Sequence, residues 1–189
     1  MKAVLISINP RWCELIASGK KVVELRKSKP KLKTPFKCYI YETKDKKFEH
    51  IGVCGYKKDG SPYHFIHGVG KVIGEFICKG IEDVYQCNSG WAHAYACIPK
   101  DKFFDYLGIP QGTHFGYDKK AFGWLISDLV IYDKPKELKE FKPWNRTEED
   151  CYFSHLGYAK PKCADCHECY VKRPPQSYMF VEELKDERK

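Results

Sequence analysis

The chain has 189 residues, of which 43% are aliphatic, aromatic or Cys and 15% are aromatic. This length fits one domain with at most a small appended module, and the apolar content excludes a disordered chain. The apolar run Ala3–Ile6 is interrupted by Ser7 and closed by Asn9-Pro10, which is too short for the core of a signal peptide. No stretch predicts a transmembrane helix. We therefore expect a cytoplasmic protein without a membrane partner.

The net charge of +8 is concentrated near the start of the chain. Residues 20–37 hold eight basic side chains against one acid, Glu24, a net charge of +7. A basic stretch of this kind is typical of a protein that binds a polyanion, because each neutralised phosphate releases a counterion. The alternative is a solvated lysine-rich loop without a partner.

The first part of the chain predicts short strands around one helix. Asn9 is a suitable N-cap, Pro10 favours the first helical position, and Gly19 is a natural C-terminal cap. Stretches rich in Val, Leu, Ile and Tyr on either side read as strands. The expected elements are a strand over 4–8, a helix over 10–18, a strand over 21–26, a Lys- and Pro-rich loop over 27–35 and a strand over 37–42.

The remainder predicts further strands, one short helix and a region without periodicity. Short strands dominate, and strands and helices do not alternate regularly, which disfavours a doubly wound sheet. We predict an α+β, mainly β fold, a small β-barrel with short helices at its rim. The expected elements are a long hairpin or surface excursion over 43–69, strands over 70–77, 123–132 and 177–182, a helix over 99–107 and an aperiodic region over 143–176.

A charged motif lies where the predicted helix meets the second strand. Glu24 and Arg26 share a face of that strand, and Lys21 lies at the turn before it. The pattern Gly-x-Lys-x-x-Glu-x-Arg, present as Gly19, Lys21, Glu24 and Arg26, resembles the signature of the ASCH family. The late run 123–128 (GWLISD) resembles the late core strand of that family.

The resemblance covers roughly residues 1–142 and implies a PUA-like β-barrel with a cleft that binds RNA. We therefore divide the chain into a barrel domain over 1–142 and a cysteine-rich extension over 143–189. Some members of the family are enzymes, either ribonucleases or amidohydrolases that act on an acetylated cytidine.

Glu75 interrupts an apolar run and, by alternation, shares a face with Ile73 and Ile77. A buried carboxylate needs a partner, and we expect Lys21 to supply it. In the amidohydrolase members the working set resembles a Lys, a Thr and a Glu. Lys21 and Glu75 match it by position, but Glu24 stands at the Thr position, where it would repel a developing oxyanion. This disfavours the deacetylase reaction and leaves acid–base cleavage of RNA open.

We therefore predict that RNA or a nucleotide binds in a basic cleft of the barrel. One alternative is a hydrolase of RNA or of a modified nucleoside, and another is a zinc-stapled module that binds a protein. The candidate catalytic residues are Lys21, Glu24 and Glu75. The candidate nucleic-acid-binding residues are Lys21, Arg26, Lys27, Lys29, Lys31 and Lys33.

The ten cysteines fall into two groups. Most are scattered, several in apolar runs where they would act as small buried hydrophobic residues. Cys163, Cys166 and Cys169 instead follow each other at three-residue spacing, which suits a tetrahedral Zn²⁺. Cys151, His155 and His167 are candidates for the fourth ligand, and we favour Cys151 because its spacing leaves a loop long enough to close. A redox pair or three plain thiols are the alternatives.

A structural zinc site predicts a fixed ratio of metal to protein. Elemental analysis of protein made without added metal should find about one zinc per chain. Cys151→Ser should weaken the retention of the metal if Cys151 is the fourth ligand. Protein without zinc, in which Cys163, Cys166 and Cys169 all titrate as free thiols, would exclude the site.

Overall fold

The computed structural model of the chain places six strands in one mixed sheet and two in a separate hairpin. The main sheet has the order β2-β7-β6-β3-β1-β8, in which β1 and β3 are parallel and the other neighbours are antiparallel. The structure describes residues 1–48, 51–56, 62–85, 89–113, 119–144 and 169–185. The strands are β1 (Lys2–Ile8), β2 (Val23–Arg26), β3 (Phe36–Glu42), β4 (Ile51–Tyr56), β5 (Pro62–Ile66), β6 (Val72–Val84), β7 (Ala121–Lys136) and β8 (Tyr178–Glu182).

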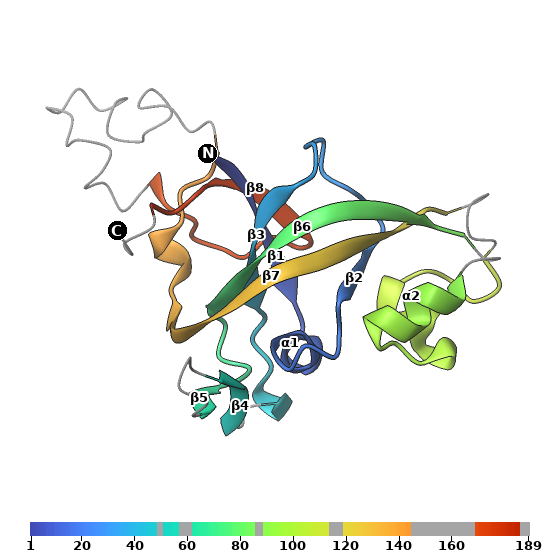
Figure 1. Cartoon of the computed structure of the whole chain (residues 1–189), viewed down its shortest axis with the longest axis horizontal. Helices are drawn as coiled ribbons and strands as arrows, with labels where there is room; N and C mark the ends of the chain where they lie inside the picture. The colour runs from blue at the N-terminus through green and yellow to red at the C-terminus, as the bar shows by residue number, and fades with distance from the viewer. Residues whose placement is uncertain (49–50, 57–61, 86–88, 114–118, 145–168, 186–189) are drawn as a thin grey trace, which may run out of the picture.

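Within the described residues, three α-helices accompany the sheet, and none of them is long and apolar enough to cross a membrane. The first begins as predicted, because Asn9 accepts a hydrogen bond from the Arg11 amide and Pro10 occupies the first turn. In Figure 1, β6 and β7 run side by side across the molecule, with α1 below them and α2 near one end. The helices are α1 (Pro10–Ala17), α2 (Ser89–Ala96) and α3 (Phe103–Leu107), and short 3₁₀ turns are η1 (Lys46–Phe48), η3 (Lys100–Lys102) and η4 (Leu138–Glu140).

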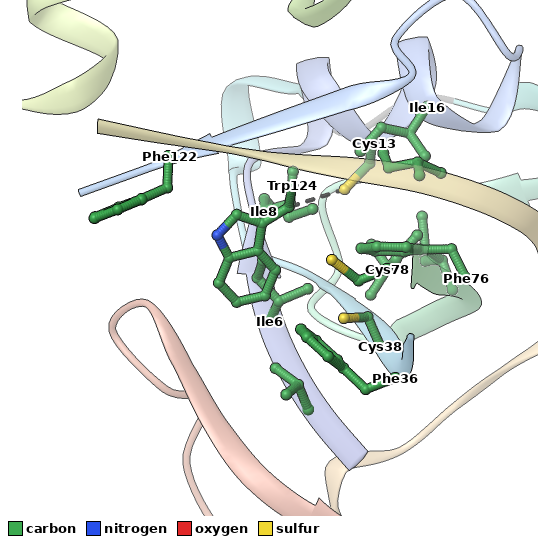
Figure 2. Packing of buried hydrophobic residues seen from close by; sticks show 14 residues of the cluster. Ile6, Ile8, Cys13, Ile16, Phe36, Cys38, Phe76, Cys78, Phe122 and Trp124 are labelled. Atoms are coloured by element: carbon green, nitrogen blue, oxygen red, sulfur yellow. Dashed lines mark hydrogen bonds between the residues drawn. The ribbon is translucent and has the colours of Figure 1, made fainter. Parts of the chain in front are cut away.

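Both faces of the main sheet are buried. Alternation along β1 sends Val4 and Ile6 to one face and Ala3 and Leu5 to the other. The first face packs against α1 in a cluster around Trp124, and Figure 2 shows these side chains gathered around the Trp124 indole. The second face is covered by chain around Phe141 and Val171. We call these the Trp124 face and the Phe141 face.

Three of the scattered cysteines lie inside the Trp124 face, as the sequence predicted. Cys13, Cys38 and Cys78 are fully buried (Figure 2). Burial raises the pKa of the Cys13 and Cys38 thiols well above the usual value and that of Cys78 to about 11. These thiols therefore remain protonated and act as small hydrophobic groups.

A bulge in β6 changes which residues share a face. Along the ladder between β3 and β6, Ile40 pairs with Gly74 and Tyr41 pairs with Val72, so Ile73 has no residue opposite it. One extra residue in a strand shifts the alternation of all the side chains that follow. Even-numbered residues of β6 before Ile73 and even-numbered residues after it therefore lie on opposite faces of the sheet.

The predicted mainly β fold is confirmed, but the six strands do not close into a hydrogen-bonded barrel within the described residues. The two ends of the strand order are β2 and β8, and no ladder joins them. A side chain spans this open side instead, because the Arg26 guanidinium in β2 donates a hydrogen bond to the backbone carbonyl of Ser7 in β1. The predicted closing strand is present as β8, which pairs with β1.

The region 43–69 contains the hairpin β4–β5, as predicted. Two differences from the predicted elements are informative, the first being that β6 and β7 both extend beyond the predicted strands. Helix α2 was not predicted, because its sequence SGWAHAYA lacks the spacing of a one-sided apolar helix. Two of its alanines are nevertheless fully buried, since small side chains allow the helix to approach β2 closely.

The close packing of β6 against β7 predicts a large effect of one methyl group. A Cβ atom at Gly74 would lie 2.4 Å from the Val130 carbonyl oxygen, a backbone atom that has little freedom to move. Gly74→Ala should therefore lower the free energy of unfolding by about 1–3 kcal/mol in urea denaturation.

Gly90 in α2 is the matched control, because a Cβ atom there would meet nothing within 4 Å. Gly90→Ala should leave stability unchanged or raise it by up to about 1 kcal/mol. Equal effects of the two substitutions would contradict the close approach of the strands.

Candidate nucleic-acid interface

The charged motif is held in place by β2 and the turn before it. Gly19 ends α1 with φ +72°, and the Lys21 amide donates to the Leu15 carbonyl of the same helix. In β2, Glu24 pairs with Trp124 and Arg26 with Phe122 of β7. Residues paired across a ladder point to the same face, so Glu24 and Arg26 lie on the Trp124 face.

Lys21 is one of the most deeply buried charged residues of the described chain, with 1% of its surface exposed. Its ammonium nitrogen lies 3.2 Å from Glu24 Oε2 and donates to the Ala96 carbonyl at 3.0 Å. The same nitrogen lies over the rings of Trp12 and Tyr106, at 5.7 and 5.3 Å from their centroids. The ammonium is thus enclosed by a carboxylate, a carbonyl and two aromatic faces.

Glu24 is equally buried and lies at the centre of the group. The Tyr106 hydroxyl lies 2.8 and 2.9 Å from its two carboxylate oxygens and donates to this carboxylate. Arg26 Nε lies 3.1 Å from Glu24 Oε1, close enough for an ion pair, although this N–H does not have the direction of a hydrogen bond. We call Lys21, Glu24, Arg26 and Tyr106 the Glu24 cluster. Its two cations and one carboxylate leave one positive charge in excess.

Burial shifts the pKa values of two members of the Glu24 cluster. Loss of solvation lowers the pKa of Lys21, and the neighbouring Glu24 carboxylate opposes this change. Burial, followed by the charge of Glu24, raises the pKa of Tyr106 well above its usual value. Tyr106 therefore keeps its proton at neutral pH and remains a donor to Glu24.

Glu75 does not join this cluster, which corrects the expected pairing with Lys21. Its carboxylate binds the Lys37 ammonium at 3.1 Å and accepts a hydrogen bond from the Tyr132 hydroxyl at 2.6 Å. Glu75 pairs with Tyr39 across the ladder and so lies on the Phe141 face. The bulge described above is the reason, since it removes the alternation on which the prediction depended.

Lys37 takes the role that was predicted for Lys21. Burial lowers its pKa, but the hydrogen bond with Glu75 and the charge of that carboxylate outweigh this effect, so the pKa of Lys37 is raised. Lys37 also lies 3.3 Å from Glu183. Glu75 thus belongs to an ion-pair network on the face opposite the Glu24 cluster.

The basic segment after Arg26 is fixed to the core by the residues between its lysines. Pro30 is buried, and Leu32 packs against the Trp124 face. Lys29 pairs with Asp83 at 3.2 Å and lies over the Phe122 ring at 4.8 Å. The lysines of this segment are all exposed, namely Lys27, Lys29, Lys31 and Lys33. They follow Arg26 directly in the chain.

The cysteine cluster falls mostly outside the described residues. Cys151, Cys163 and Cys166 are not among them, and Cys169 is described and buried. No group of three or more His, Cys, Asp or Glu side chains could hold a metal ion in the part of the chain that the structure describes. The zinc site predicted from the sequence stays a prediction.

Sequence reasoning missed two members of this site. Tyr106 was not singled out in the helix that contains Phe103 and Phe104, although a tyrosine among phenylalanines often carries a buried hydrogen bond. Ser7 contributes its backbone carbonyl to Arg26, and such a role leaves no mark in the sequence. The Ser7 hydroxyl also donates to the Pro175 carbonyl at 2.6 Å, which brings the segment before β8 to this site.

No family model and no curated protein matches the chain. Its structure is similar to the crystal structure of ASCH from Zymomonas mobilis, with a TM-score of 0.53 and 20% identity over 96% of this chain and 88% of that one. For a Tyr-to-Phe mutant of the Zymomonas protein, the TM-score is 0.53 and the identity 19%, over 97% of this chain and 92% of that one. For a Ser-to-Ala mutant, the TM-score is 0.54 and the identity 19%, over 96% of this chain and 89% of that one. The chain therefore has an ASCH-like fold, as the motif around Lys21 suggested.

The burial of the Glu24 cluster predicts that its carboxylate is needed for stability. Glu24→Gln would leave two neighbouring cations without their counter-charge, and should lower the free energy of unfolding by about 3–5 kcal/mol. Asp83→Asn is the matched control, since Asp83 and Lys29 are 45% and 49% exposed. It should cost less than about 1 kcal/mol.

Urea denaturation, monitored by tryptophan fluorescence, measures the free energy of unfolding of both variants. A Glu24→Gln variant as stable as Asp83→Asn would mean that water reaches the Glu24 cluster.

Proposed function

We propose that the chain binds RNA through Arg26 and the basic segment 27–33 of its ASCH-like fold. The observation that carries this proposal is the continuity of positive charge, from the uncompensated cation of the Glu24 cluster to the exposed lysines that follow Arg26. The ASCH resemblance, which implies a PUA-like RNA-binding domain, supports the same assignment.

Arg26 links the buried and the exposed parts of this surface. Its guanidinium contacts Glu24 and the Ser7 carbonyl, and the side chain remains 14% exposed. A guanidinium that is held on two sides is already ordered, so it loses little conformational freedom when it binds a phosphate. Arg26 is therefore suited to fix the position of one phosphate, and the lysines attract the rest of the strand.

An exposed aromatic side chain lies beside the basic segment. Tyr85 is 45% exposed, and its hydroxyl lies 3.4 Å from Asp83 Oδ2, on the carboxylate that also binds Lys29. Single-stranded RNA is bound by stacking of bases on aromatic rings next to cationic contacts with the backbone. We infer that the strand passes from Arg26 along the lysines, within reach of Tyr85.

Binding without turnover accounts for the Glu24 cluster better than hydrolysis does. The lowered pKa of Lys21 would suit a general base, but its ammonium is enclosed and a substrate has no direct access to it. The second predicted acid, Glu75, lies on the other face of the sheet. We therefore assign Lys21 the role of fixing Glu24, and through it Arg26.

Neutralising part of the basic segment should weaken RNA binding in a salt-dependent manner. Lys31→Gln combined with Lys33→Gln removes two exposed charges, so the slope of log K against log salt should fall by about 1.4 for a single strand. Fluorescence anisotropy with a labelled single-stranded RNA at several salt concentrations measures this slope.

Lys46→Gln combined with Lys47→Gln is the matched control, because it removes two exposed charges of η1. It should leave the slope nearly unchanged. The RNA should be recovered intact after long incubation, and acetylated cytidine should remain acetylated. Equal loss of affinity in both double variants would refute a localised RNA site, and cleaved RNA or released acetate would favour the hydrolase.

A further inference from the structure

A pocket of about 600 Å³ lies on the side of the sheet opposite the Glu24 cluster. Gly70 and three longer segments of the chain line it: the end of β3 with the residues that follow, the turn η4, and the segment 170–174 before β8. Tyr41 forms part of its wall and belongs to the Phe141 face. The pocket is therefore distinct from the proposed RNA surface on β2.

The charge of this pocket is positive. Lys44, Lys139 and Lys172 line it, one from each of the three segments. The single acid of the lining, Glu137, is already engaged: it binds Lys71 at 3.0 Å and accepts a backbone hydrogen bond in the capping box of η4. Lys44 and Lys139 make no ion pair with any described residue.

The hydroxyl of Tyr41 also faces this space. The residue as a whole is only 3% exposed, and its hydroxyl forms no hydrogen bond within the described part of the chain. Burial, followed by the charge of Glu137, raises the pKa of Tyr41, so the hydroxyl is a neutral donor at physiological pH. The hydroxyl oxygen is not fully buried, so it can donate to a group bound in the pocket.

Gly70 gives this pocket a close-packed wall. A Cβ atom at Gly70 would lie 2.5 Å from Lys44 Cγ and 2.8 Å from the Tyr41 hydroxyl oxygen. The glycine thus lets the Lys44 stem and the Tyr41 hydroxyl lie against the same stretch of backbone. Packing against Gly70 thus restrains the Lys44 stem and the Tyr41 hydroxyl, although Lys44 as a whole residue is exposed.

We propose that this pocket binds a phosphate group, with the Tyr41 hydroxyl and the ammonium groups of Lys44, Lys139 and Lys172 as its donors. Phosphate oxygens accept several charge-assisted hydrogen bonds at once, which this donor set can provide. The volume exceeds that of a phosphate alone, and the apolar side chains of Leu138 and Val171 line the same space. A mononucleotide and a nucleotide within an RNA strand both fit this chemistry.

Calorimetric titration of the full chain with inorganic phosphate and with adenosine monophosphate tests the proposal. Both should bind saturably, the nucleotide more tightly. Lys44→Gln combined with Lys139→Gln should weaken binding at least about tenfold, and Tyr41→Phe about two- to tenfold. Lys100→Gln combined with Lys102→Gln, which removes two exposed charges of η3 outside both proposed sites, should bind both ligands with unchanged affinity.

An RNA titration of the Lys44→Gln, Lys139→Gln variant distinguishes the two sources of the phosphate. Reduced RNA affinity would assign the pocket to a strand, and unchanged RNA affinity with reduced nucleotide affinity would assign it to a free nucleotide. The proposal is overturned if neither phosphate nor nucleotide binds the native chain, or if both bind the pocket variants as tightly as the native chain. Neither of these results would affect the proposed RNA site on β2.

Discussion

The arrangement of the elements around β2 depends on the contacts of the buried Glu24 carboxylate. Through Lys21 it holds the end of α2, whose last carbonyl accepts from the same ammonium, and through Tyr106 it holds α3. Beside it, Arg26 reaches the Ser7 carbonyl in β1. One buried acid therefore connects two helices with both sides of the open sheet. Because no ladder joins β2 and β8, this side-chain network takes the place of the hydrogen bonds that would close a barrel.

The same network is the reason why we propose binding at this site and not catalysis. A catalytic lysine must meet its substrate, and the ammonium of Lys21 is instead surrounded by protein. Its partner Glu24 has both oxygens engaged by Tyr106. What reaches the surface is the outer part of Arg26 and the lysines after it. The buried groups fix the direction of the guanidinium, and the exposed groups supply the long-range attraction for a polyanion.

Sequence reasoning succeeded where the relevant contacts are local. The N-cap at Asn9, the helix after it and the shared face of Glu24 and Arg26 all depend on residues within one turn or one strand. It failed for Glu75, because strict alternation was assumed along a strand that contains a bulge at Ile73. Whether a strand has an extra residue is decided by its neighbours in the sheet. The partner Tyr106 is equally distant in sequence, 82 residues from Glu24.

The two positively charged regions of the molecule differ in whether their lysines are close together in the sequence. The basic segment after Arg26 is a run of neighbours in the chain, and its charge is evident from the sequence alone. The three lysines of the pocket are separated by long stretches of chain, and only the fold brings them to one space with the Tyr41 hydroxyl. A row of lysines on a loop can follow a flexible strand. Lysines that converge on one pocket beside the Tyr41 hydroxyl favour a single phosphate group over an extended polyanion. The two sites that we propose, on the two faces of one sheet, thus differ in their mode of anion recognition.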